Sequence, residues 1–586
     1  MISNKHIGRL VAALMTILVI FTIVYTYFPS SLPVSTSVDA VSMEYASTLF
    51  DADSILRVNI EMEESQWEDM LKNAISEAWY ACDITVNGTT YKNVGIRPKG
   101  NTSLTQVASD DTTDRFSFKI KFDYYIDGQT CDGLDCLILN NLMSDASYMK
   151  EYLSYDMFQF MGVVSSLYSF ADISLNGDTW GLYLALEAPD ASFLQRNYGI
   201  SYGQLYKPET TEIGGGMAAD DNMRDKVPDK ETTDNHMGKG GFGFGSTNGN
   251  LSYLGDDSSD YAYIFDNAIT DSSSTDESRV IQALKNISEG TELEASLDID
   301  QMLRYMAVNV FLVNLDSYFG NMLHNYLLYE EAGQLTMLPW DYNLAFAGFQ
   351  SNSAKDAVNL AINSVVSGAS LEDRPLLFQL MQVPEYQEKY HEYLDQLVSR
   401  YFESGYFEAQ LAKIDALITS YAANDPTAFY THDEYQMAVN ALKTFCELRV
   451  ESVRGQLNGE IPSTEEAQAE TPDSLINTDS LNISDMGTQG GGRGGMKDNS
   501  EERPDFRDKP DTNMEAASEN IPALQPAAEA GNFSHDRPQA MGQNMPEASG
   551  TQNIQTWLLY GGCFIATVLG LLFAKFYRRR LTPNNK

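Results

Sequence analysis

The stretch that decides the fold is residues 311–343, FLVNLDSYFGNMLHNYLLYEEAGQLTMLPWDYN. Two polar clusters, NLDSYFGN and PWDYN, flank an apolar run that turns before the strand-like LTMLPW. Asp316 and Asn321 have the spacing D-x-x-x-x-N, and a second aspartate, Asp341, follows the strand. In phosphoryl transfer one carboxylate orients the acceptor hydroxyl, while an amide and another carboxylate hold the Mg²⁺ that bridges the phosphates. The pattern therefore predicts a phosphoryl-transfer site.

A simpler interpretation of this stretch stays open beside the first. Asp316 and Asn321 could cap or turn a loop after a buried helix, because Asp and Asn are common at helix caps and turns. An acidic chain contains many chance matches to D-x-x-x-x-N. The position of Asp341 directly after a strand favours the phosphoryl-transfer interpretation.

These residues resemble the core of the CotH (spore coat protein H) kinase family, which are secreted or surface atypical protein kinases. The matching positions are Asn314, Asp316, Asn321, His324–Asn325, Leu328–Tyr329 and Pro339–Trp340–Asp341. Further blocks follow the family's order: GIRPKGNTS (95–103), SFKIKFD (117–123), DGLDCLILNN (132–141), NGDTWGLYLALE (176–187) and LYKP (205–208). The resemblance spans roughly residues 50–460.

The resemblance implies a role for each polar residue of the central stretch. Asp316 would be the catalytic carboxylate, and Asn321 and Asp341 would bind the metal ion. The cofactors would be ATP and Mg²⁺, or Mn²⁺ in its place. The family commonly ends this block W-D-x-D, whereas Asn343 stands at the last position here. Asn343 can donate an oxygen to the metal, but one negative charge is missing.

Several charged residues upstream are candidates for contacts with ATP. In FSFKIKF the phenylalanines and Ile120 face one side of a strand, and the lysines face the other. Such a lysine face is either solvent-exposed or directed at phosphates. The resemblance favours a phosphate contact by Lys119, with Arg115 as the competing assignment. Arg97 and Lys99 stand beside GNTS (100–103), a tight loop whose N–H groups could bind phosphate.

Five further positions complete the candidate site. Glu151, early in a helix predicted over 144–162, is either an exposed helix residue or the partner of a sheet lysine, as in the kinase Lys–Glu pair. Glu187 and Lys207 match family positions and are counted with the residues that would bind ATP. His324 and Asn325 also match family positions, and the sequence explains none of these four matches.

The composition restricts the partners of the protein. The net charge is −43, from 82 acidic and 39 basic residues, which argues against binding to nucleic acid. The five cysteines show no metal-ligand spacing, and a chain of 586 residues can bury a core without disulfides. Pairing of Cys131 with Cys136 stays open. The resemblance implies an exported or surface protein as the substrate.

Both ends of the chain contain apolar segments that predict membrane association. Residues 1–40 are predicted to be a signal peptide or signal anchor, and 554–577 a transmembrane helix. Basic residues after the second segment place the tail, 578–586, in the cytoplasm. We therefore expect a cell-membrane protein whose main domain is on the extracytoplasmic side.

Between these segments the pattern predicts an α+β, bilobed fold like that of an atypical protein kinase. The predicted parts are a β-rich N-lobe (41–208), a loop-rich insertion (209–290), a helical C-lobe (291–458) and a disordered stalk (459–553). The turn Asn87–Gly88 predicts a β-hairpin within the first part.

Two functional hypotheses follow. The first is a surface-anchored, Mg²⁺-dependent kinase that transfers the γ-phosphoryl group of ATP to serine or threonine of exported proteins. The alternative is a catalytically inactive pseudokinase that acts as a cell-surface or spore-coat scaffold. Intact Asp316, Asn321 and Asp341 favour the first hypothesis, and Asn343 favours the second. A calcium-binding adhesin is disfavoured, because no D-x-D-x-D-G loop with full spacing occurs.

Overall fold

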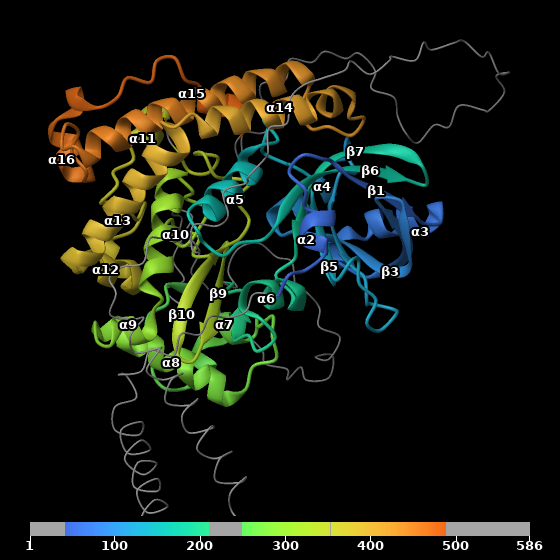
Figure 1. Cartoon of the computed structure of the whole chain (residues 1–586), viewed down its shortest axis with the longest axis horizontal. Helices are drawn as coiled ribbons and strands as arrows, with labels where there is room; N and C mark the ends of the chain where they lie inside the picture. Colours follow the sequence, from blue (N-terminus) through green and yellow to red (C-terminus); the bar gives the residue numbers. More distant parts are fainter. Residues whose placement is uncertain (1–40, 210–248, 352, 488–586) are drawn as a thin grey trace, which may run out of the picture.

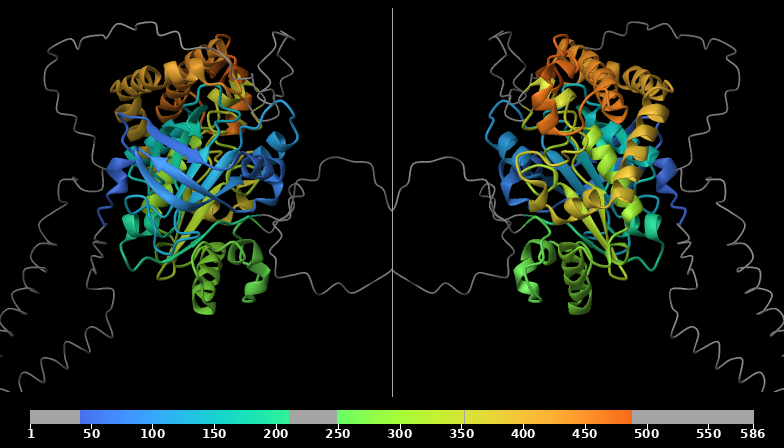
Figure 2. Two further views of the ribbon diagram at one scale, coloured as in Figure 1. Left: turned by 90° about the vertical axis from the view of Figure 1, so that its right-hand side faces the viewer. Right: turned by 90° about the vertical axis from the view of Figure 1, so that its left-hand side faces the viewer.

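The computed structural model describes residues 41–209, 249–351 and 353–487. A β-rich part is followed by a largely helical part, which confirms the predicted α+β organisation (Figures 1 and 2). The predicted membrane segments, 1–40 and 554–577, and the tail 578–586 lie outside these ranges. Among the residues that the structure describes, no helix has the length and apolar character needed to cross a bilayer.

Seven strands close into a barrel in the order β1-β2-β3-β4-β5-β7-β6. Neighbours run antiparallel except β1 and β6, whose parallel pairing, Leu56 with Ala171, completes the closure. The strands are β1 (Leu56–Glu61), β2 (Tyr80–Val86), β3 (Thr89–Lys99), β4 (Ser117–Lys121), β5 (Cys136–Asn140), β6 (Tyr168–Leu175) and β7 (Asp178–Glu187). Closure leaves the barrel no free edge.

Local sequence patterns explain these strands. The hairpin β2–β3 turns at Asn87–Gly88, where both residues have positive φ (47° and 89°), as predicted from the Asn-Gly pair. On β4, Phe118 and Ile120 point into the barrel core, and Lys119 points outward. Alternation of apolar and polar residues thus places one set of side chains inside and leaves the lysines outside.

The second part contains a small sheet in the order β10-β9-β8, packed on helix α10 (Figure 1). Its strands are β8 (Gln204–Tyr206), β9 (Tyr326–Glu331) and β10 (Gln334–Pro339). The helices of eight or more residues in this part are α8 (Ser274–Glu289), α10 (Ile299–Phe311), α12 (Pro375–Gln382), α13 (Pro384–Gln396), α14 (Tyr406–Asn424) and α15 (His432–Leu457). Helix α14 also contacts β7 of the barrel.

The shorter and connecting helices complete the description. In the β-rich part these are α2 (Tyr45–Thr48), α3 (Glu64–Lys72), η2 (Ala74–Ser76), α4 (Thr102–Ala108), α5 (Lys150–Phe160) and α6 (Ala191–Tyr198). In the helical part they are η4 (Ser258–Tyr261), α7 (Ala262–Phe265), α9 (Leu293–Ser296), α11 (Ala354–Val358), η5 (Leu371–Asp373), η6 (Leu397–Phe402), α16 (Glu465–Glu470), η7 (Pro472–Ser474) and η8 (Ile483–Met486).

Two predicted boundaries differ from the structure. Helix α8 lies within 209–290, the segment predicted to be rich in loops, because Ser273 and Asp276 form a capping box before an apolar stripe. Residues 459–487, predicted as the start of a disordered stalk, are folded, because Leu481 and Met486 are buried in the main core. The predictions for 210–248 and 488–553 concern residues outside the described ranges.

The cysteines that the structure describes are free thiols. Cys82, Cys131, Cys136 and Cys446 are all buried and reduced, so no bond joins Cys131 to Cys136. Burial raises the pKa of each thiol, to about 12 for Cys131 and Cys136, which keeps both protonated.

Candidate active site

The loop between α10 and β9 carries Asp316, and its backbone is tightly braced. Arg374 donates hydrogen bonds from Nε to the carbonyl oxygen of Tyr318 (3.1 Å) and from Nη2 to that of Gly320 (2.8 Å). A Cβ atom on Gly320 would lie 2.0 Å from the carbonyl oxygen of Leu315, so only glycine fits there. These contacts therefore fix the conformation of the loop that carries Asp316.

Both carboxylate oxygens of Asp316 are engaged by neighbouring side chains. His324 Nε2 lies 2.7 Å from Oδ1, and Asn325 donates from Nδ2 to Oδ2 (2.9 Å) and to the backbone oxygen of Asp316 (2.9 Å). Asp316 is only 6% exposed. His324 and Asn325, which the sequence analysis could only match to family positions, thus hold the carboxylate in one orientation.

Asp341 lies at the same end of the β9–β10 hairpin as the Asp316 loop. The register pairs Tyr326 with Pro339, so Asn325 and Trp340 leave the hairpin side by side. Asp341 (φ 59°) and Asn325 (φ 57°) both have the left-handed backbone conformation, which is uncommon outside glycine. Such strain gathers at functional sites, where the surrounding structure holds it in place.

Lys99 and Glu151 are joined through one amide. Lys99, the last residue of β3, donates from Nζ to Asn140 Oδ1 (3.0 Å), and Asn140 donates from Nδ2 to Glu151 Oε2 (2.9 Å). Lys99 Nζ also lies 5.8 Å from the centre of the Trp340 ring. Glu151 Oε1 is buried without a hydrogen-bond partner among the described residues. We call Lys99, Asn140, Glu151 and Asp341 the lysine–acid cluster.

The charges of the cluster influence one another strongly. Burial lowers the pKa of Lys99, and the charges of Asp341 and Glu151 oppose that change. Burial, followed by the charge of Asp341, raises the pKa of Glu151 from its ordinary 4.5 to about 8. A cation bound beside Asp341 would relieve the repulsion between the two acids. Carboxylate oxygens are the kind of ligand that a divalent ion such as Mg²⁺ prefers, and a metal ion beside Asp341 stays a prediction.

Two further predicted cations act on this cluster electrostatically. The charges of Lys207 and Arg97 both lower the pKa of Lys99. Arg97 is paired with Glu77 and stacked on Trp79, with its guanidinium carbon 5.2 Å from the ring centre. Lys207 forms an ion pair with Glu209. Positive charge is thus grouped around Lys99, where an anionic phosphate would be attracted.

The structure places Lys119 outside the cluster. Its Nζ lies 3.7 Å from Asp190, and its side chain is 29% exposed. Lys119 and Arg97 are cross-strand neighbours on the outer face of the barrel, while Lys99 stands further along β3. Lys99, and not Lys119, is the lysine that reaches Asn140 beside Glu151. A phosphate contact by either lysine stays a prediction.

Arg115 and Glu187 are buried structural residues, which corrects their assignment to ATP. Arg115 donates to both oxygens of Asp425 (2.9 Å each) and to the carbonyl oxygen of Asn141 (3.0 Å). Glu187 accepts from Arg196 Nε (2.8 Å) and from the hydroxyl of Tyr45 (2.5 Å). Neither side chain has exposed surface to offer a ligand.

The two asparagines predicted as metal ligands have separate contacts. The amide of Asn321 packs against Gly368, where an added Cβ would lie 2.3 Å from Nδ2. Asn343 Nδ2 lies 3.5 Å from the carbonyl oxygen of Met143. Across the described ranges, no three residues of the types His, Cys, Asp and Glu are grouped as a metal site. A metal site with amide ligands stays a prediction.

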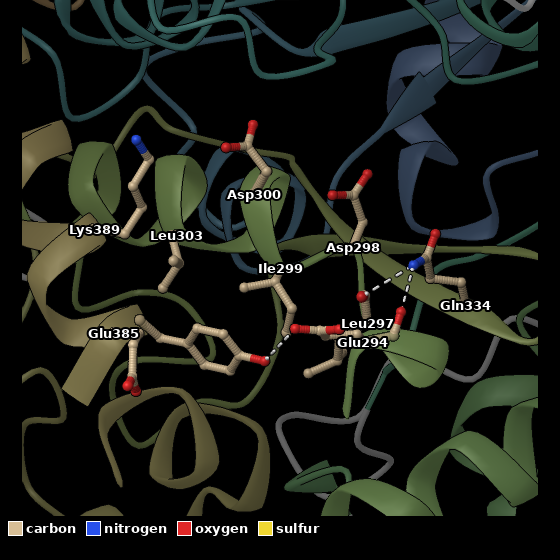
Figure 3. A pocket seen from close by; sticks show the side chains of 10 residues that line it. Glu294, Leu297, Asp298, Ile299, Asp300, Leu303, Gln334, Glu385 and Lys389 are labelled. Atoms are coloured by element: carbon tan, nitrogen blue, oxygen red, sulfur yellow. Dashed lines mark hydrogen bonds between the residues drawn. The ribbon is translucent and has the colours of Figure 1, made fainter. Parts of the chain in front are cut away.

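A separate cavity of about 470 Å³ lies at the other end of β10 (Figure 3). Glu294, Asp298, Asp300, Glu385 and Lys389 are among its lining residues. Gln334, the first residue of β10, also lines it, whereas Asp341 follows the last residue of that strand. The cavity is therefore distinct from the lysine–acid cluster.

These observations define an α+β protein whose barrel and helical part meet at a lysine–acid cluster, beside an aspartate held by His and Asn. The sequence matches the model of the family described as CotH kinase protein over residues 96–453. Because that match covers more than half of the chain, the protein belongs to the CotH kinase family.

One curated relative is similar over part of the chain. Inner spore coat protein H of Bacillus subtilis (strain 168) is 23% identical over 295 residues, which are 49% of this chain and 69% of that protein. The family predicted from the sequence is thus confirmed.

Proposed function

We propose that the protein is an atypical protein kinase that transfers the γ-phosphoryl group of ATP to serine or threonine of an exported protein. The observation that carries this proposal is the link Lys99–Asn140–Glu151 beside Asp341. Protein kinases likewise place a Lys–Glu pair from a sheet and a helix next to a metal-binding aspartate. The barrel and the helical part would correspond to the two lobes of a kinase.

Each residue has a distinct task in this proposal. Lys99, with the charges of Arg97 and Lys207 nearby, would bind the phosphates, and Glu151 would hold Lys99 in place. Asp316, oriented by His324 and Asn325, would accept the proton of the substrate hydroxyl.

The metal assignment rests on chemistry rather than on observed contacts. Asp341, with amide oxygens of Asn321 and Asn343, would hold Mg²⁺ or Mn²⁺. When bound, the ion would neutralise charge on the phosphates.

The test is phosphoryl transfer from γ-labelled ATP by the purified chain with Mg²⁺ or Mn²⁺, to itself and to generic acceptors. Lys99→Met, Asp316→Asn and Asp341→Asn should each lower transfer by about 10²-fold or more, because each removes a group that acts on the transition state. Lys119→Met is the matched control, since Lys119 lies on the same barrel face but pairs with Asp190. It should leave transfer within about twofold of wild type.

The proposal would be overturned if wild type transferred no label and ATP gave no metal-dependent rise in Tm. Equal losses in Lys99→Met and Lys119→Met would overturn the assignment of Lys99 alone.

The inactive scaffold is the second candidate, and Asn343 favours it. Its amide lies within 3.5 Å of Met143 O, and it replaces the second aspartate common in the family. A scaffold would bind its partners equally well with Asp316→Asn.

Location is also part of the proposal. We expect a membrane-anchored protein outside the cytoplasm, on the predictions for 1–40 and 554–577. A surface or spore-coat setting is consistent with the relative, which is an inner spore coat protein.

A further inference from the structure

Residues 459–487, which we call the C-terminal strap, run from the end of α15 back along that helix to the start of α5. Asn359 fixes the strap in both directions: it donates from Nδ2 to the carbonyl oxygen of Ile476 (3.1 Å) and accepts from the Ile476 N–H (2.9 Å). Met486 has no exposed surface and is part of the main core. The strap is therefore an integral part of the fold.

The end of the strap is attached to the start of α5, the helix that carries Glu151. Lys150 donates from its buried Nζ to the carbonyl oxygen of Gly487 (2.5 Å) and to that of Ser144 (3.2 Å). The N–H of Ala146 donates to the carbonyl oxygen of Met486 (3.2 Å). Two hydrogen bonds thus connect the strap to the first residue of α5 and to the loop that precedes it.

The geometry at Gly487 leaves no room for a side chain. Gly487 has φ 81°, and a Cβ atom there would lie 2.7 Å from the carbonyl oxygen of Ser144. The loop before α5 is itself strained, since Leu142, Ser144 and Tyr148 have φ near 60°. Without the strap, the buried ammonium of Lys150 would lose one of its two carbonyl acceptors, which is costly for a buried charge.

We propose that the strap sets the position of α5. Glu151 then accepts its hydrogen bond from Asn140, and so is linked to Lys99, only while the carbonyl oxygen of Gly487 accepts the hydrogen bond from Lys150. The inference rests on the proposed function and deepens it, because it makes Lys150 and Gly487 positioning residues for the lysine–acid cluster. Release of the strap lets the first turn of α5 withdraw, and Glu151 leaves the cluster.

This arrangement gives the site a route for regulation from outside the folded body. The chain passes from Gly487 towards the segment predicted to enter the membrane, 554–577. Along the sequence, Gly487 is the described residue nearest to that predicted segment, so tension on the chain from that side would act on Gly487 first.

The test compares full-length Gly487→Ala with full-length Gly405→Ala. Gly405 is a matched control, because its φ of 83° is almost the same and nothing lies within 4 Å of an added Cβ. The first readout is amide hydrogen exchange over residues 149–161. The second is carbodiimide labelling of Glu151, detected by mass spectrometry. Neither readout depends on kinase activity.

Gly487→Ala should speed exchange over 149–161 by about tenfold or more, the effect of losing a hydrogen bond to a buried charge. It should also make Glu151 accessible to labelling, while Gly405→Ala matches wild type. Unchanged exchange in Gly487→Ala, or equal increases in both variants, would overturn the proposal. If Gly487→Ala does not fold, Lys150→Gln is measured in the same way and should give the same local increase.

Kinetics separate a positioning role from a loss of folded protein. A smaller folded fraction lowers the apparent kcat but leaves KM unchanged, whereas a displaced Glu151 should raise KM for ATP by about fivefold or more. An unchanged KM in a variant with fast α5 exchange would overturn the link to the cluster. If wild type transfers no phosphoryl group, the proposed function is overturned. Hydrogen exchange would still decide whether the strap holds α5 in position.

Discussion

At the residue scale, the lysine–acid cluster shows how burial changes what a side chain does. Glu151 accepts one hydrogen bond from Asn140, and its other oxygen has no hydrogen-bond partner among the described residues. A carboxylate in this setting carries the cost of burial and of the nearby charge on Asp341. The sequence offered Glu151 as either a paired or an exposed glutamate, and the structure selects the buried position.

The raised pKa of Glu151 makes stability depend on pH. Its pKa is about 8 in the folded state and about 4.5 when solvated. The folded state therefore binds more protons between these values, so stability falls as pH rises through that window. Glu151→Gln removes this dependence. Relative to that variant, wild type should lose on the order of 1–3 kcal/mol of unfolding free energy between pH 5 and pH 8.

Urea unfolding of both proteins at several pH values measures this difference. Asp83→Asn, at a half-buried acid whose pKa is lowered by a hydrogen bond from Lys92, serves as the control and should retain the wild-type trend over the same range. Parallel curves for wild type and Glu151→Gln would contradict the prediction.

At the element scale, the buried Arg449 holds α15 against the helix that leads into the site. Arg449 on α15 donates to the carbonyl oxygens of Val310 (3.0 Å) and Phe311 (3.3 Å), at the C-terminal end of α10. It also donates to those of Val358 and Leu360. Helix ends leave such carbonyls without partners inside the helix. Arg449 thus anchors the element that leads into the Asp316 loop.

We expect Arg449→Lys to lower the unfolding free energy by about 3 kcal/mol, although charge is conserved. The guanidinium of Arg449 donates to two carbonyl oxygens at the end of α10 and to those of Val358 and Leu360. A lysine ammonium cannot reach all four, so some of these buried carbonyl oxygens would have no donor. Arg400→Lys, at an exposed residue within η6, is the control and should cost less than about 1 kcal/mol. Thermal unfolding measures both, and a similar Tm for the two variants would contradict this role of Arg449.

Arg115 and Asp425 join the barrel to the connection between α14 and α15. Both side chains are fully buried, 2.9 Å apart. Arg115→Met should destabilise the protein by about 3–5 kcal/mol, because it leaves the Asp425 charge buried without its partner. The double variant Arg115→Met/Asp425→Leu should be more stable than Arg115→Met, since no charge remains buried. Chemical denaturation would count against this account if the double variant were the least stable.

The elements that the sequence predicted are those with a strong local pattern. The Asn87–Gly88 hairpin, the alternating strand β4 and the helical character of residues 291–458 follow from turn chemistry and apolar spacing. Alternation placed Lys119 on one face of its strand, and Lys99 was expected beside the GNTS loop, but neither signal could say which lysine meets Glu151. That choice depends on Asn140, which is far away in the sequence.

Other features could be found only in three dimensions. The roles of His324 and Asn325 come from the return of the loop onto Asp316. The strap was missed because its composition is polar, and only a few residues, such as Met486, anchor it. The Ser273 capping box before α8 was a usable local signal in a segment judged by its composition.

At the scale of the whole molecule, the folded body extends to Gly487, beyond the boundary expected at 458. A chain of residues 41–458 lacks Ile461, Leu481 and Met486. It would therefore expose the apolar surface against which these buried residues pack. It should be about 2–5 kcal/mol less stable than residues 41–487, the range typical for loss of large buried side chains. Calorimetry of the two chains measures the difference, and equal Tm values would contradict the inclusion of the strap in the core.

The pairing of Arg115 with Asp425 also has a consequence for the order in which the protein folds. The two residues are 310 positions apart, so the ribosome makes Arg115 long before its partner. The parallel closure of the barrel by β1 and β6 is likewise non-local. A nascent barrel must therefore carry an uncompensated guanidinium or stay open until α14 has been synthesised. The barrel, which is synthesised before the helical part, is then among the last parts of the protein to reach its final packing. A chaperone that binds the nascent chain would bind an incomplete barrel.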